Sequence, residues 1–256
     1  MFSPTSLVSR VNSGECDSVD SYFIDVFNLS QTVSQASSGR FDPTVAPLVD
    51  LWGFGRDGRE VELPDSNSIN EALEKIGIDR CRIDNGIIVK GHCEMEFDFS
   101  AIAKGYGVEK IGDMLNSHGC DDYMVEIGGE IQLSGKNPNG ELWHIQVDAP
   151  VENSKPGESS LTVLELSDCG VATSGNYRNY REKKGQTAWH TIDPTTGFPA
   201  AREVVSATVI APGCALADAL ATAIMASPAD SAAVILAHFK ETSAIIVLDS
   251  GQLIKL

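Results

Sequence analysis

The stretch from Asp98 to Ser134, DFSAIAKGYGVEKIGDMLNSHGCDDYMVEIGGEIQLS, decides the fold class. After Ser100 its apolar residues recur at helical spacing as far as Gly119, which predicts an amphipathic helix with a glycine stop. Two short β-rich runs follow, 123–127 and 131–134, with a glycine pair between them. A helix followed directly by a hairpin, without a regular strand–helix–strand order, predicts an α+β fold.

The same patterns extend this assignment in both directions along the chain. Upstream we expect helices at 17–38, with Tyr22 on the apolar face, and at 68–76, and a hairpin at 82–90 that turns on Asn85-Gly86. Downstream we expect strands at 143–147, 161–166, 190–192 and 204–210, helices at 215–225 and 228–239, and a closing hairpin at 244–256. We therefore expect one compact domain, residues 1–256, of mixed and largely antiparallel sheets with packed helices.

Charge and composition narrow the class of partner. The chain has 36 Asp and Glu against 19 Lys and Arg, a net charge of −17, which argues against nucleic acid and anionic membrane surfaces. No window approaches the roughly 20 consecutive apolar residues of a membrane span. The six cysteines form no CxxC pair, so we expect mostly buried thiols.

Four segments combine small residues with polar side chains, and three of them also with an aromatic residue, in a way that a plain core does not require. They are 39–44 leading into 51–55, 98–106, 126–130, and 190–199. Glycine lets a backbone approach a ligand closely, and exposed N–H groups at such turns bind anions. Taken singly, each segment is also compatible with an ordinary turn.

Three residues suggest a charged ligand by their chemistry alone. Asp218 and Thr222 stand four residues apart on one helix face and offer the hard oxygen ligands that Mg²⁺ prefers, although a solvated or capping aspartate is the alternative for Asp218. Lys104 lies early in its helix, where an anion such as phosphate is favoured, and its alternative is a solvated surface lysine.

Taken together and in order, these segments resemble the family of FAD:protein FMN transferases, the ApbE family once described as thiamine-biosynthesis lipoproteins. Its marks here are SLVSRVN (6–12), GRFDPTVAPLVDLWGFG (39–55), DFSAIAKGYGVEKI (98–111), VEIGGEI (125–131), ATSGNY (172–177), HTIDPTTGFPA (190–200) and ADALAT (217–222). The resemblance implies an enzyme that cleaves FAD with Mg²⁺, attaches FMN to a Thr or Ser hydroxyl of an acceptor flavoprotein, and releases AMP.

The resemblance also implies roles for individual residues. His190 is the expected general base, with a structural histidine at the Asp193 turn as the alternative. The expected magnesium ligands are the Ala101 carbonyl, Asp218 and Thr222. The expected FAD contacts are Phe2, Phe41, Asp42, Asp98, Lys104, Gly128, Gly129 and Ile192. For the aromatic residues core packing is the alternative, and for Asp98 a helix cap.

The match departs from the family at the beginning of the chain. Phe2 stands where the family has Tyr, and the strands and lipoprotein signal that precede that position in the family have no counterpart, so we expect an N-terminally truncated member. The family suggests the periplasmic side of the inner membrane, although this sequence shows no signal for it, and a cytoplasmic location stays open. We expect contact with a membrane only through a lipid anchor of the kind that the family carries, which does not occur in this sequence.

Two further functions use the same residues. If water replaces the acceptor hydroxyl, the protein is an Mg²⁺-dependent FAD pyrophosphatase that gives FMN and AMP. If no transfer occurs, it is a non-catalytic FAD-binding protein.

Overall fold

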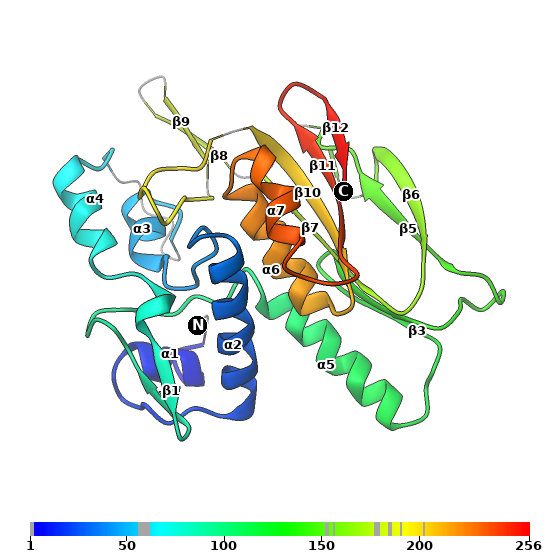
Figure 1. Ribbon diagram of the computed structural model, residues 1–256, viewed down its shortest axis with the longest axis horizontal. Helices are drawn as coiled ribbons and strands as arrows, with labels where there is room; N and C mark the ends of the chain where they lie inside the picture. The colour runs from blue at the N-terminus through cyan, green and yellow to red at the C-terminus, as the bar shows by residue number, and fades with distance from the viewer. Residues whose placement is uncertain are drawn as a thin grey trace. The chain divides into compact units, whose positions relative to one another are not determined.

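The computed structural model describes residues 3–55, 62–151, 154–155, 157–176, 180–183, 186–189, 191–201 and 203–256. The chain divides into two compact units, Met1–Ala101 with Arg181–Ala200, and Ile102–Tyr180 with Ala201–Leu256 (Figure 1). Helices combined with antiparallel sheets confirm the α+β class. That residues 1–256 form one domain stays a prediction.

The first unit is mainly helical. Its elements are α1 (Leu7–Asn12), α2 (Ser21–Ala36), α3 (Ala46–Leu51), α4 (Ser66–Leu73), the 3₁₀ turn η1 (Ile78–Arg80), and the hairpin of β1 (Arg82–Asp84) and β2 (Ile87–Val89). The hairpin turns on Asn85 and Gly86 with φ of 50° and 78°, as the sequence predicts. A separate two-stranded sheet is formed by β8 (Tyr180–Lys183) and β9 (Gln186–Trp189).

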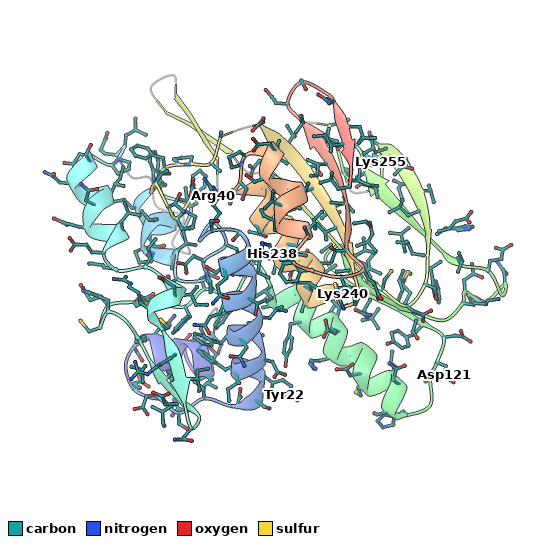
Figure 2. All side chains as sticks on the ribbon, viewed as in Figure 1. Tyr22, Arg40, Asp121, His238, Lys240 and Lys255 are labelled. Atoms are coloured by element: carbon teal, nitrogen blue, oxygen red, sulfur yellow. The ribbon has the colours of Figure 1, made fainter. Side chains whose placement is uncertain are left out.

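Helix α2 carries the aromatic core of this unit. The Asp20 carboxylate accepts a hydrogen bond from the Phe23 N–H at 2.9 Å and so begins the helix. The Phe23 ring packs edge-on against Phe97 and Phe99 at 5.6 and 5.3 Å between centroids. Tyr22 is 61% exposed (Figure 2), so the expectation that it shares the buried face is wrong.

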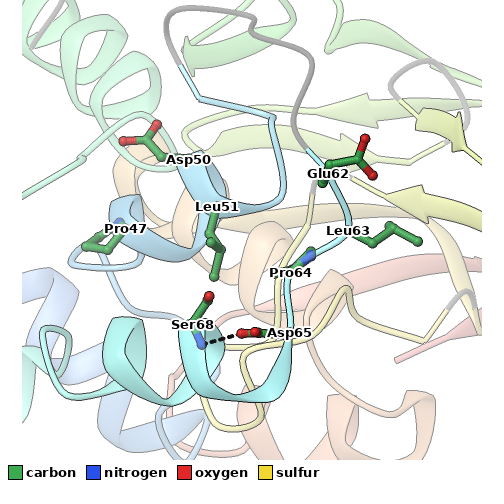
Figure 3. A pocket seen from close by; sticks show the side chains of 8 residues that line it. All are labelled: Pro47, Asp50, Leu51, Glu62, Leu63, Pro64, Asp65 and Ser68. Atoms are coloured by element: carbon green, nitrogen blue, oxygen red, sulfur yellow. Dashed lines mark hydrogen bonds between the residues drawn. The ribbon is translucent and has the colours of Figure 1, made fainter.

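Helices α3 and α4 pack around a second small core of Leu48, Ile69 and Ile192. Asp65 begins α4 by accepting the Ser68 N–H at 2.8 Å, and a hollow lined by Leu51 and Leu63 lies beside this cap (Figure 3). These contacts place the segment around Ile192 against α3 and α4.

The second unit is built on a six-stranded antiparallel sheet in the order β12-β11-β10-β7-β4-β3. Its strands are β3 (Tyr123–Ile127), β4 (Glu130–Ser134), β7 (Gly170–Gly175), β10 (Val204–Ala211), β11 (Ser243–Leu248) and β12 (Leu253–Lys255). A separate hairpin joins β5 (Trp143–Asp148) to β6 (Ser160–Leu166). The helices are α5 (Ala103–Ser117), α6 (Cys214–Met225) and α7 (Ala232–Leu236), with the 3₁₀ turn η2 (Ala229–Ser231).

Small residues let α6 lie directly on this sheet. Helix α6 packs on β7 and β10 (Figure 1), and buries Ala217, Leu220 and Ile224 completely. A Cβ at Gly170 of β7 would stand 2.2 Å from the Cys214 backbone nitrogen, so only glycine allows this approach. The sheet and α6 thereby form two packed layers, and this packing fixes the position of the residues of α6.

Several sequence predictions differ from the structure. The strand predicted at 190–192 is wrong over its described residues, because Ile192 makes only an isolated bridge with Pro199. The helix predicted at 228–239 is reduced to η2 and α7. Among the cysteines, Cys81, Cys169 and Cys214 are buried, Cys16 is half-buried, and Cys93 and Cys120 are exposed.

The helices of the described residues are too short or too polar to cross a lipid bilayer.

Candidate functional site

Lys104 lies at the start of α5, where the sequence predicts a binding site for an anion. Helix α5 begins at Ala103, later than the sequence predicts, and its Ile102 N-cap provides no side-chain hydrogen bond. The Lys104 ammonium pairs with the Glu130 carboxylate, and the lysine side chain is 49% exposed while that of Glu130 is 4% exposed. Lys104 is therefore neither buried nor simply solvated. It is held on a buried carboxylate with half of its surface free for a ligand.

Asp218 approaches the same place from α6. Its Oδ2 accepts a hydrogen bond from the Gly105 N–H at 3.0 Å, and the residue is 4% exposed. Burial raises the pKa of Asp218 to about 6; the Gly105 N–H and Lys104 act against this rise, and the negative charge of Glu130 adds to it. The alternative of a solvated aspartate is wrong, because this carboxylate is buried next to other charges.

A close contact between α5 and α6 makes this arrangement possible. A Cβ at Gly105 would stand 2.3 Å from the Cys214 carbonyl oxygen and 2.8 Å from the Asp218 Cβ. Only glycine therefore lets the first turn of α5 reach α6 closely enough for its N–H to meet Asp218. Thr222, one turn after Asp218, is half-buried, and its hydroxyl lies 3.2 Å from that of Ser174 on β7. The predicted shared face of Asp218 and Thr222 is confirmed.

The glycine pair forms the tight turn between β3 and β4. Gly128 and Gly129 have φ of 62° and 98°, and Ile127 pairs with Glu130 across the turn. The Gly128 Cα lies against Lys104, since a Cβ there would meet the Lys104 Cδ at 3.9 Å. A Cβ at Gly129 would meet nothing within 4 Å, and its N–H donates to Glu126 Oε1 at 2.9 Å. The turn is thus open beside Lys104.

Glu130 is the site residue that sequence reasoning missed. It lies inside the quoted VEIGGEI motif, yet its position after a glycine turn on an exposed hairpin gives no sign of burial. The residue is 3% exposed and its Oε2 has no hydrogen-bond partner in the described part of the chain. Lys104, Glu130 and Asp218 therefore combine one ammonium with two buried carboxylates.

A divalent cation fits this cluster by charge and by donor type. One ammonium against two carboxylates leaves a net negative charge, and one carboxylate oxygen is buried without a partner. Carboxylate and hydroxyl oxygens are hard ligands of the kind that Mg²⁺ takes together with water. Among the described residues, no three His, Cys, Asp or Glu side chains gather as a metal cluster, so Asp218 would need hydroxyl, carbonyl or water ligands beside it.

Asp98 and Ala101 lie just before α5, at the end of the first unit. Asp98 Oδ1 accepts the Ser100 N–H at 2.9 Å, and the Asp98 N–H donates to the Pro43 carbonyl at 2.6 Å. Asp98 therefore stabilises the turn before the helix rather than capping α5 itself. Ala101 is half-buried in this turn.

Phe41 and Asp42 belong to the same unit and are both engaged by the chain itself. Phe41 is 2% exposed, which places its ring in the core. Asp42 Oδ1 accepts from the Thr44 N–H and hydroxyl at 2.8 and 2.6 Å, and its Oδ2 accepts from the Ile78 N–H at 3.2 Å. Burial raises the pKa of Asp42 although these hydrogen bonds act to lower it.

The last motif is only partly described, because His190 and Phe2 lie outside the described residues. The Ile192 side chain is 5% exposed and packs in the α3–α4 core. After it, the Asp193 carboxylate accepts the Thr195 N–H and hydroxyl at 2.8 and 2.7 Å and faces Arg40 at 3.8 Å. The Trp52 indole N–H donates to the Gly197 carbonyl at 2.8 Å, which fastens this turn to α3.

Comparisons with known proteins agree on one family. The model described as "ApbE family" matches residues 1–246. The chain is 40% identical over 223 residues to the FAD:protein FMN transferase of Vibrio cholerae serotype O1, covering 86% of this chain and 66% of that relative. A second transferase, from Haemophilus influenzae, is 37% identical over 78% of this chain and 58% of its own length. The chain thus spans less than two thirds of these curated relatives.

The chain is also similar to a solved structure. The flavin transferase ApbE from Vibrio cholerae matches with a TM-score of 0.85 and 32% identity, covering 100% of this chain and 81% of that one. The match covers the whole chain, so the α+β fold class of this chain agrees with that of the solved structure.

Proposed function

Because the chain belongs to the ApbE family, we propose that it transfers FMN from FAD to a Thr or Ser hydroxyl of an acceptor flavoprotein and releases AMP. The observation that carries this proposal is the cluster of Lys104, Glu130 and Asp218 beside the open glycine turn. The pyrophosphate of FAD is a dianion, and a chain with a net charge of −17 repels it unless positive charge is held at the site.

Lys104 supplies the first positive charge. Its side chain is anchored on Glu130 yet half exposed, so its ammonium can donate to a phosphate oxygen without leaving the carboxylate. The first turn of α5 adds the positive end of the helix dipole, although its Gly105 N–H is already held by Asp218. Gly128 and Gly129 leave room beside Lys104 for the phosphates.

A magnesium ion supplies the second positive charge in this proposal. Asp218, Thr222 and the Ala101 main-chain carbonyl would hold it, as the family resemblance implies, and the unbalanced carboxylate charge supports a cation there. When bound, Mg²⁺ would neutralise charge on the pyrophosphate oxygens.

The transfer step needs a base and a well-oriented phosphate. His190 accepts the proton of the acceptor hydroxyl, whose oxygen then bonds to the FMN-side phosphorus. The bond from that phosphorus to the bridging oxygen breaks, and AMP leaves with that oxygen. Lys104 stabilises the negative charge on the transferred group, so catalysis is mainly positioning and charge stabilisation.

The remaining FAD contacts are those that the family resemblance implies. Phe2, Phe41, Asp42, Asp98 and Ile192 are proposed to surround the flavin and adenine. The burial of the Phe41 and Ile192 side chains favours contacts through their main-chain atoms. The periplasmic side of the inner membrane is the location that the family favours.

A transfer assay tests the proposed function. The protein is incubated with FAD, Mg²⁺ and an acceptor domain, and with the same domain whose target Thr is replaced by Val. We expect the first acceptor to gain the mass of an esterified FMN, AMP to appear in equal amount, and the Thr→Val acceptor to stay unlabelled. FMN and AMP without a labelled acceptor would instead identify a pyrophosphatase, and intact FAD a binding protein.

A further inference from the structure

Glu130, the ion-pair partner of Lys104, has one carboxylate oxygen that is buried without a hydrogen-bond partner among the described residues. It is the first residue of β4 and is 3% exposed. Its Oε1 accepts from the Lys104 ammonium, and its Oε2 is buried without a partner in the described part of the chain. A carboxylate oxygen that has lost its water and gained no donor destabilises the fold, so a donor or a cation bound at this oxygen would stabilise the protein.

Two carboxylates meet consecutive residues of α5, because Glu130 pairs with Lys104 and Asp218 accepts the Gly105 N–H. Lys104 already holds Oε1 of Glu130, and Asp218 is itself a carboxylate that interacts with Glu130. Neither satisfies Oε2 in the structure. A neutral donor would satisfy Oε2 but would leave the negative charge of the two carboxylates unbalanced. A hydrated divalent cation would supply both a positive charge and O–H groups that donate to Oε2.

We propose that Glu130 is a positioning residue of the cation site, holding the coordinated water of a divalent cation at Asp218 through Oε2 while Oε1 holds Lys104. One buried carboxylate thereby fixes both positive charges that the pyrophosphate meets. The inference rests on the proposed function, which identifies the site. It adds Glu130 as the residue that holds both the Lys104 ammonium and the divalent cation in place.

Binding of Mn²⁺ to the full chain without FAD tests this inference, with free Mn²⁺ followed by electron paramagnetic resonance. Glu130→Gln keeps the shape and removes the charge. The matched control is Glu126→Gln on the same hairpin, since Glu126 is exposed and Gln retains an acceptor for the Gly129 N–H. Asp218→Asn is the reference for loss of the site.

We expect Glu130→Gln to weaken Mn²⁺ binding by about 10- to 100-fold, as removal of an outer-shell partner does, and Glu126→Gln to leave it unchanged. The melting temperature of the metal-free Glu130→Gln protein is expected to stay the same or rise, because a buried charge is removed and half-exposed Lys104 is solvated.

Wild-type affinity in Glu130→Gln, or an equal loss in Glu126→Gln, would overturn the inference. A lower metal-free melting temperature with unchanged Mn²⁺ affinity would do the same, because Glu130 would then have a structural role only. If the wild-type chain and Asp218→Asn both fail to bind Mn²⁺, this inference falls, and the transfer assay decides the proposed reaction separately.

Discussion

At the scale of single residues, replacing Lys104 tests whether its ammonium binds the phosphates of FAD rather than the flavin ring. Lys104→Ala is expected to weaken FAD binding by about ten- to a hundredfold, the typical effect of losing a charged hydrogen bond, and to leave riboflavin binding nearly unchanged. Riboflavin has no phosphate for the ammonium to meet. Titration of both ligands by flavin fluorescence measures this difference.

The change also leaves Glu130 without its counter-charge, so thermal unfolding must show that the Lys104→Ala protein is folded before affinities are compared. Equal losses for FAD and riboflavin would assign Lys104 a role other than phosphate binding.

His190 gives a second prediction at this scale, drawn from the sequence. As the general base, His190→Gln should lower the transfer rate by about 10² to 10⁴ while FAD affinity and melting temperature stay the same. Raising the pH should restore part of the rate, since the acceptor hydroxyl then ionises more easily. An early-melting variant with normal transfer per folded molecule would show a structural histidine.

Asp42 predicts how stability depends on pH. Burial raises its pKa above the usual 3.8, so the folded chain holds the proton more tightly than the unfolded chain does. This contribution is fully present below the usual pKa and is lost as pH rises through the raised value. Compared with Asp42→Asn, the wild-type protein should therefore lose stability as the pH rises above the usual carboxyl pKa of 3.8, measured by urea unfolding. A wild-type advantage that grows with pH would mean that the fold favours the ionised carboxylate.

At the scale of elements, the contact between α5 and α6 brings Lys104 and Asp218 together. Gly105→Ala forces a Cβ to within 2.3 Å of the Cys214 carbonyl and should destabilise the protein by about 1–3 kcal/mol. Gly107, on the same helix, meets nothing within 4 Å, so Gly107→Ala should stabilise it by about 0.5–1 kcal/mol through helix propensity.

Chemical denaturation of the two variants measures both effects, and Mn²⁺ affinity should fall only in Gly105→Ala. Similar stability changes in the two variants would show that helix propensity, rather than close packing, governs this part of α5.

Elements that depend on local sequence patterns could be predicted, whereas elements that depend on packing between distant residues could not. The turns at Asn85-Gly86 and Gly128-Gly129 have positive φ, and the Asn-Gly and Gly-Gly pairs predict such turns because these residues tolerate positive φ. Strand β7 was missed because its small residues serve contacts with α6, as Gly170 does, rather than alternate in hydrophobicity. Helices α1 and α3, six residues each, are too short to show a periodic face.

The candidate site divides in the same way. Asp218 and Thr222 share a helix face that spacing reveals. The burial of Asp218 depends on Gly105, 113 residues away in sequence, and the role of Glu130 depends on Lys104, 26 residues away. Such partners become visible only when the helices and the hairpin are assembled.

At the scale of the whole molecule, the proposed function requires FAD to be cleaved at the cluster of Lys104, Glu130 and Asp218. The most direct measurement is a crystal structure of the full chain with FAD and Mn²⁺, in which anomalous scattering locates the metal. We predict a peak in contact with the Asp218 carboxylate and the Thr222 hydroxyl, and a phosphate oxygen of FAD within hydrogen-bond distance of the Lys104 ammonium. FAD bound with its phosphates away from Lys104, or a metal peak without Asp218 as a ligand, would contradict the account.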